Sequence, residues 1–266
     1  MSALPQAVAG SLLLAASTAW GFYQKPTGTA FPSGDTVPEN LLRIELRFSA
    51  PLRIPLSIDH VKLVGGDGRE VEHAFLDLPL PSADGRRVTV LLDPGRVKSG
   101  LAENRALGRA LHAGSAVTLE VDDPELARPI RKTWRVTGFN ADPPRPDLWT
   151  FRLPRRDTKD PLEVRLGAPL SSTAESFIAI RGPDARRVAG TAHLEQGETV
   201  WRFVPASSWR KGVYGLVTRP ELEDSAGNRP CGPFEAMGAS RIPCAAAAIR
   251  NFQPRGPSGP RITGRI

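Results

Sequence analysis

A segment of nine residues occurs twice in this chain, and the repeat limits the folds that the chain can adopt. Residues 44–52 read Ile-Glu-Leu-Arg-Phe-Ser-Ala-Pro-Leu, and residues 162–170 read Leu-Glu-Val-Arg-Leu-Gly-Ala-Pro-Leu. The similarity continues in order, through a Gly/Asp turn (65–69 and 182–186) and a further apolar segment (88–94 and 199–205). An ordered internal repeat indicates two copies of one structural unit.

Apolar and polar residues alternate within each copy, as in residues 42–48 and 162–166. A period of two is typical of a strand with one buried face. Turns rich in Gly, Pro and Asp separate these segments, and each copy spans about 90–100 residues, the size of an immunoglobulin-like domain. We therefore predict an all-β fold of two tandem immunoglobulin-like antiparallel β-sandwich domains joined by a Pro-rich linker. The best helical candidate is a short stretch within residues 101–112.

The copies define the expected domain boundaries. We predict Ig-like domain 1 at 28–137, the Pro-rich linker at 138–148 and Ig-like domain 2 at 149–236. The run Asp142-Pro143-Pro144-Arg145-Pro146 favours an extended, semi-rigid backbone. After Cys231 the alternation fades, so we expect a weak last strand at 232–236 and a disordered tail at 237–266. Whether Cys231 and Cys244 form a disulfide stays open at this point.

The N-terminus has an apolar run at residues 7–16, followed by the small residues Ser17 and Ala19. This pattern predicts a signal peptide over residues 1–19, and with it an exported protein that is periplasmic, secreted or envelope-associated. No Lys or Arg precedes the run, so a frayed Ala-rich terminus and a start codon assigned too far downstream remain alternatives. The run is too short to cross a bilayer as a helix.

The formal net charge is +7, and Arg outnumbers Lys 29 to 6. The arginines are spread over strand positions that alternate with apolar residues, which we interpret as the solvated outer faces of strands: Arg43, Arg47, Arg165 and Arg202. No helix-turn-helix, zinc-finger or RNA-recognition pattern accompanies them, so we expect no specific nucleic-acid partner.

Catalytic motifs are missing from the sequence. It contains no Gly-x-Ser-x-Gly, His-Glu-x-x-His or phosphate-loop pattern. We therefore predict no enzymatic activity, no cofactor and no metal site. Acidic residues near the domain ends could bind calcium or form turns by themselves, and the turn is the favoured interpretation. They are Asp122, Asp123 and Glu125 in copy one, and Glu221, Glu223 and Asp224 in copy two.

The copies differ most at residues 95–113, an insertion that copy two replaces with residues 206–211. Loops of sandwich domains often carry specificity, although the insertion could also be a crossover that packs its leucines on the sandwich edge. Trp201 and Trp209 could serve as stacking platforms for sugars, with Trp201 expected in the core. The interaction candidates are Arg96, Lys98, Asn104, Arg105, Arg109 and Trp209.

Several motifs together resemble the bacterial Ig-like domains of the SbsA type. They are Glu-x-Arg-x-x-Ala-Pro-Leu, Trp-Arg-Phe-x-Pro, Trp-Arg-Lys-Gly-x-Tyr (209–214) and Leu-Glu-Asp-Ser-Ala-Gly-Asn (222–228). The resemblance implies an exported or envelope-associated protein whose modules space or present other parts, with no fixed ligand site. We expect a monomeric, non-enzymatic scaffold or adhesion-type protein whose partner is an envelope protein or polysaccharide. An accessory carbohydrate-binding protein with an aromatic sugar-binding face is the alternative.

Overall fold

The computed structural model describes residues 24–98, 100–234 and 248–256. The predicted signal peptide at 1–19 and parts of the predicted tail lie outside these residues. No helix of the described part is long and apolar enough to cross a membrane.

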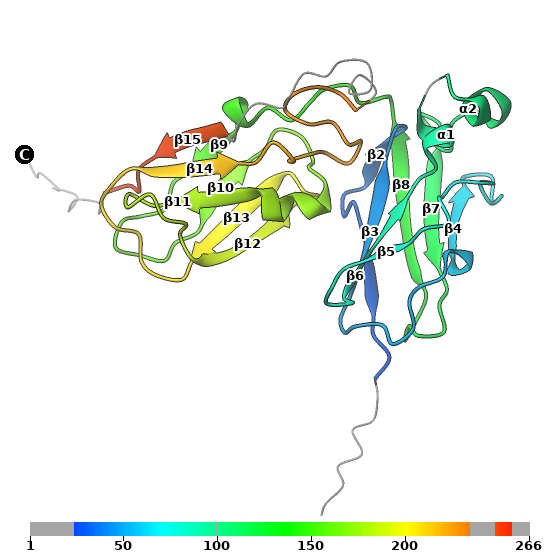
Figure 1. The fold of residues 1–266 in the computed structure, drawn as a ribbon, viewed down its shortest axis with the longest axis horizontal. Helices are drawn as coiled ribbons and strands as arrows, with labels where there is room; N and C mark the ends of the chain where they lie inside the picture. The colour runs from blue at the N-terminus through cyan, green and yellow to red at the C-terminus, as the bar shows by residue number, and fades with distance from the viewer. Residues whose placement is uncertain (1–23, 99, 235–247, 257–266) are drawn as a thin grey trace, which may run out of the picture.

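Domain 1 is a sandwich of two four-stranded sheets (Figure 1). One sheet has the order β1-β3-β6-β5, formed by β1 (Gly28–Phe31), β3 (Arg43–Phe48), β6 (Arg87–Leu91) and β5 (Leu80–Pro81). The other has the order β2-β8-β7-β4, formed by β2 (Thr36–Pro38), β8 (Ile130–Thr137), β7 (Ala116–Val121) and β4 (Val61–Gly65). The pairing of β2 with β8 is parallel, whereas the other paired strands run antiparallel.

Domain 2 repeats this arrangement except that its second sheet, among the described residues, has three strands and no counterpart of β2. The two domains confirm the predicted all-β architecture. Its first sheet has the order β12-β13-β10-β9, formed by β12 (Gly190–Glu195), β13 (Val200–Pro205), β10 (Leu162–Arg165) and β9 (Thr150–Arg152). Its second sheet has the order β11-β14-β15, formed by β11 (Ile178–Arg181), β14 (Tyr214–Thr218) and β15 (Ala248–Phe252). The repeated nine-residue segment contributes the equivalent inner strands β3 and β10.

Each domain has its own apolar core because the alternating residues of the inner strands point between the sheets. Ile44 and Leu46 of β3 are fully buried in one core, and Leu162 and Val164 of β10 are fully buried in the other. Trp201 lies in the second core, stacked on Phe203 with their ring centroids 5.7 Å apart, as predicted for this strand.

Short helices connect the strands: η1 (Ile58–His60), α1 (Pro94–Val97), α2 (Ala102–Leu107), η2 (Pro146–Leu148) and η3 (Ser172–Phe177). Asp93 begins α1, because its side chain accepts a hydrogen bond from the Gly95 amide and Pro94 suits the first helical position. Helix α2 lies in the stretch expected to be helical. It ends at Gly108, whose φ of 73° is easily adopted only by a residue without Cβ.

The prediction of a disordered tail over 237–266 is wrong for residues 248–256. Strand β15 lies there and pairs antiparallel with β14, so it takes the place in domain 2 that β8 has in domain 1. Phe252 is buried in the core, and Arg250 donates hydrogen bonds to the carbonyls of Pro146 and Trp149. One apolar anchor and a hydrogen-bonded arginine hold this strand, so its sequence lacks the apolar alternation that marks the others.

Candidate functional site

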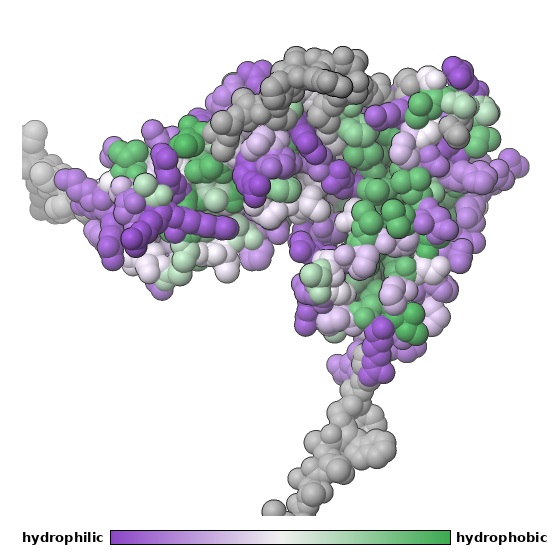
Figure 2. Space-filling model, in the orientation of Figure 1, coloured by the Kyte–Doolittle hydropathy of each residue, from purple (hydrophilic) through white to green (hydrophobic). Residues whose placement is uncertain are grey.

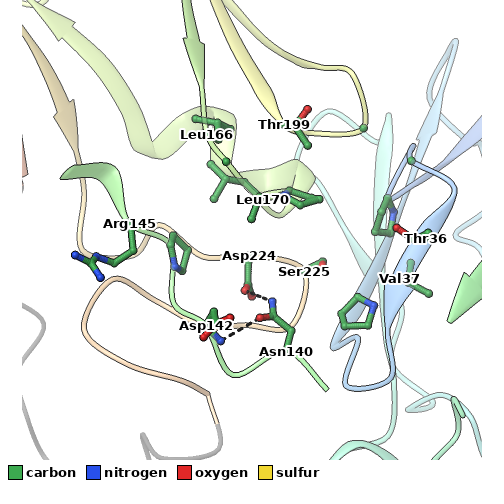
Figure 3. Close-up of a pocket in the computed structure, with 18 of the residues that line it drawn as sticks. Thr36, Val37, Asn140, Asp142, Arg145, Leu166, Leu170, Thr199, Asp224 and Ser225 are labelled. Carbon is green, nitrogen blue, oxygen red and sulfur yellow. Dashed lines mark hydrogen bonds between the residues drawn. The ribbon is translucent and has the colours of Figure 1, made fainter. Parts of the chain in front are cut away.

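The two domains meet through the β2–β3 turn of domain 1, the linker, and the loop at 222–234 of domain 2 (Figure 1). Asn140 of the linker joins both domains. Its backbone amide donates to Asn40 Oδ1 (2.9 Å), and its carbonyl accepts from Asn40 Nδ2 (2.9 Å). Its side-chain Nδ2 donates to Asp224 Oδ2 (2.8 Å), as Figure 3 shows. The linker therefore fastens the domains together by hydrogen bonds rather than serving only as a spacer.

Asp224 organises the domain 2 side of this junction. Its Oδ1 accepts from the amides of Ala226 and Asn228, both at 2.9 Å. Its Oδ2 accepts from the side chains of Asn228 and Asn140. Burial raises the pKa of Asp224 to about 6, and the hydrogen bonds from Asn228, Ala226 and Asn140 oppose that rise. The sequence Asp-Ser-Ala-Gly-Asn thus forms a turn, and its carboxylate is bonded both within the turn and to Asn140 of the linker.

A second set of contacts crosses the junction from the hairpin between β12 and β13. Glu198 is buried, and its carboxylate accepts from the Ser33 amide (2.9 and 3.2 Å) and the Ser33 hydroxyl (2.6 Å). The Leu42 amide also donates to the Ser225 carbonyl (2.9 Å). A buried carboxylate is tolerated only where hydrogen-bond donors of the protein replace the water molecules that would otherwise solvate it. The amide and the hydroxyl of Ser33 are such donors.

Arg43 and Arg47 are not solvated outer-face residues, so that interpretation is wrong for both. Arg43 pairs with Glu223 at 2.8 Å across the junction. Arg47 donates to the Ser172 carbonyl (2.9 Å) and lies 3.6 Å from Glu175, both in η3. Arg165, the equivalent of Arg47 in copy two, is exposed. The second domain therefore covers the Glu-x-Arg face of copy one, while that of copy two stays open.

A cleft with a volume of about 590 Å³ lies between the domains (Figure 3). Strand β2 lines one side with Thr36 and Val37, and the repeated segment of domain 2 lines the other with Leu166 and Leu170. Linker prolines complete the wall. Its polar groups Asn140, Asp142 and Asp224 are hydrogen-bonded to one another. The cleft is the space left by a fastened junction, and it contains no pairing of a nucleophile with a base among the described residues.

The insertion at 95–113 braces domain 1 from within, so the prediction of an interaction site is wrong for Arg96. Its guanidinium is buried and donates to the carbonyls of Glu72 and Gly108. Leu111 is buried in the core as a crossover requires, whereas Leu101 and Leu107 are exposed. The insertion is therefore in part the crossover that packs its leucines on the sandwich, which was the alternative interpretation.

The other candidates of the insertion have separate positions. Lys98 lies over the Phe234 ring of domain 2, with Nζ 4.2 Å from the centroid. Arg109 lies over Phe139 at 5.1 Å and pairs with Glu39 at 3.7 Å. Arg105 is exposed, and the buried Nδ2 of Asn104 has no hydrogen-bond partner among the described residues. The structure thus does not bring the candidates together into one surface.

The aromatic candidates are core residues. Trp209 is buried, and its indole N–H donates to the Asp160 carbonyl (2.8 Å). Its ring packs edge-on against Tyr214 and Phe252. Trp201 is also buried, so neither ring can stack on a sugar, and the prediction of Trp209 as an interaction residue is wrong.

Within the described ranges, no group of three or more His, Cys, Asp or Glu side chains is placed to hold a metal ion. Cys231 is disulfide-bonded, and the other cysteine of the chain, Cys244, lies outside the described residues.

No protein-family model matches the sequence, and no curated protein matches it either. Among solved structures, a chimeric titin Z1Z2 carrying a peptide from decorin is 10% identical, with 89% of this chain and 100% of that chain covered and a TM-score of 0.28. The titin tandem A164–A165 is 10% identical, with 84% and 92% covered and a TM-score of 0.24. CopC from Methylosinus trichosporium OB3b is 16% identical, with 43% and 93% covered and a TM-score of 0.27.

Likenesses at these identities and TM-scores carry no ligand or partner over to this chain. The assignment of two tandem Ig-like sandwiches rests on the strand order of each domain, with two sheets closing on one core.

Proposed function

We propose that this protein is an exported, non-enzymatic Ig-like scaffold of the SbsA type in the bacterial envelope. Its two domains keep a fixed relation and present surfaces to an envelope protein or polysaccharide. The sandwiches supply the frame, and loops and open sheet faces supply the contacts.

The fastened junction is the observation that carries this proposal. Asn140 bonds Asn40 in one domain and Asp224 in the other, and Glu198 bonds Ser33 independently. Domains joined by a plain linker move freely unless their interface is large or specifically bonded. A module that spaces or presents other parts gains from such bonds, because a fixed geometry lowers the entropy lost on binding.

The resemblance to SbsA-type domains supports the envelope setting, and the structure gives its most recognisable motif a physical role. The Asp224–Asn228 turn and Asn140 together satisfy the buried carboxylate of Asp224, and the turn packs against Leu42 and accepts a hydrogen bond from its amide. The alternative function needs exposed aromatic rings to bind sugars. Trp201 and Trp209 are both buried in the core, so we do not propose it.

Cell fractionation of the native organism, N-terminal sequencing of the mature protein and in-cell crosslinking test the proposal. We expect an envelope fraction, a mature N-terminus downstream of residue 19, and a crosslinked envelope component. An intact Met1 end in the cytoplasmic fraction would overturn export. A free envelope protein that crosslinks to nothing would overturn the scaffold role.

A further inference from the structure

The end of domain 2 farthest from domain 1 carries a concentrated positive charge. At this end the loop at 153–161, between β9 and β10, is hydrogen-bonded to Trp209. Beside it lie two further loops, residues 182–188 after β11 and residues 206–213 before β14 (Figure 1). They enclose a hollow of about 360 Å³ lined by Arg186, Arg187, Arg210 and Lys211, with the hydroxyls of Ser207 and Ser208. Figure 2 shows that most of the surface at this end is hydrophilic in that view. We name these two loops and their hollow the distal basic site.

The cations of the distal basic site have no ion-pair partner in the part of the chain that the structure describes. By contrast, Arg155 of the neighbouring loop at 153–161 is paired with Asp160, and Arg152 of β9 is paired with Glu163. The one carboxylate in the hollow, that of Asp184, accepts a hydrogen bond from the Arg186 amide at 3.1 Å. It therefore shapes its own turn and leaves four cationic side chains facing solvent.

The loops are held in place before any ligand arrives. A Cβ on Gly212 would lie 2.5 Å from the Pro183 ring, which shows how closely the loops pack. The Tyr214 hydroxyl accepts from the Arg210 amide at 2.9 Å, and the Gly182 amide donates to the Arg186 carbonyl at 2.7 Å. A preformed arrangement of like charges loses little entropy on binding an anion.

Copy one provides an internal comparison. The turn at 65–69 repeats the geometry of 182–186, since Asp67 accepts from the Arg69 amide as Asp184 does from that of Arg186. The next residue is Glu70 in copy one and Arg187 in copy two, and both form the equivalent β-bridge. Glu70 pairs with Lys62 at 3.0 Å. The positive charge at this position thus belongs to copy two and is not required by the turn.

We propose that the distal basic site binds the anionic groups of an acidic polysaccharide. Guanidinium groups suit carboxylate and phosphate oxygens, and the serine hydroxyls can bond sugar hydroxyls. Single-stranded nucleic acid fits less well, because Trp209 and Tyr214 are buried and cannot stack on bases. A bilayer fits less well, because the site is hollow and its loops expose one large apolar side chain, Val213. This inference rests on the proposed function only in one respect, namely that an envelope protein would encounter an acidic polysaccharide.

Binding of purified full-length protein to polygalacturonate and to a phosphate-bearing mannan tests the site at 50 mM salt. Neutral dextran, anionic vesicles and duplex DNA are the comparison ligands. The test variant combines Arg187→Glu, which places the copy-one residue in the same bridge, with Arg210→Gln. The control combines Arg128→Glu with Arg135→Gln at exposed positions of domain 1. Both variants lower the net charge equally, from +7 to +4.

We expect binding to at least one acidic polymer and none to dextran. The test variant should bind at least tenfold more weakly, about 1.4 kcal/mol, and the control less than twofold. Equal losses in both variants would overturn the site, because they would indicate attraction by net charge alone. If the protein binds neither acidic polymer, the polysaccharide assignment is overturned. Tighter binding to vesicles or DNA than to the acidic polymers would also overturn it. Because purified protein is used, these results are independent of whether the protein is exported.

Discussion

Replacing Asn40 by Ala tests how the junction is held. Asn40 is buried and exchanges two hydrogen bonds of 2.9 Å with the backbone of Asn140. A hydrogen bond contributes about 0.5–1.5 kcal/mol net, so the variant should weaken the junction by about 1–3 kcal/mol. If the contacts across the junction open together, this corresponds to roughly 5–150-fold in the opening equilibrium.

Amide hydrogen exchange measures this opening at two other backbone amides of the junction. The Leu42 amide donates to Ser225 and the Ser33 amide donates to Glu198, both across the junction. Both amides should lose protection by that factor in Asn40→Ala, and neither should change in the control Asn251→Ala, whose side chain is exposed on β15. If the Leu42 and Ser33 amides keep their wild-type protection, the Asn40 contact is local and does not hold the junction closed.

Three further predictions concern single residues. Because burial raises the pKa of Asp224 from 3.8 to about 6, the folded state holds its proton more tightly. The free energy of unfolding should therefore fall by at most about 3 kcal/mol as the pH rises from 4 to 6. Urea unfolding at several pH values should show this fall in the wild-type protein and not in Asp224→Asn. An equal dependence on pH in both proteins would contradict the raised pKa. Glu198→Ala should lower the free energy of unfolding by about 1–3 kcal/mol. Ser33→Ala should lower it by less, because the Ser33 amide still donates to Glu198. A loss from Ser33→Ala that equals or exceeds the loss from Glu198→Ala would count against this contact. Since Trp201 and Trp209 are buried, neutral polysaccharide should leave the tryptophan fluorescence unchanged, and a saturable shift would restore the aromatic site.

The repeat made the architecture predictable, because alternation in equivalent segments marks equivalent strands. The alternation at 42–48 and 162–166 located β3 and β10, and the turns at 65–69 and 182–186 have the same hydrogen bonds. Strand β15 could not be predicted in this way. Its Phe252 is its one buried side chain, and its pairing with β14 depends on backbone bonds that the sequence does not record.

The junction was hidden for a related reason. Arg43 and Arg47 alternate with apolar residues as any solvated strand residue does, and their partners Glu223 and Glu175 are far away in the sequence. Asn140 gave no signal, because a polar residue beside a proline-rich run is typical of a free linker. The difference between Glu70 and Arg187, by contrast, is visible in the sequence, because the charge is reversed between the aligned copies at this position.

Residual dipolar couplings show whether the two domains form one rigid unit. Couplings are measured for backbone amides of residues 28–137 and 149–234 of wild-type protein in one aligned medium, and an alignment tensor is fitted to each domain. If the junction holds the domains rigidly, the two tensors have equal magnitude and their axes coincide when the domains are placed as in Figure 1. Tensors of clearly different magnitude would show that the domains reorient independently and that the junction does not fix them.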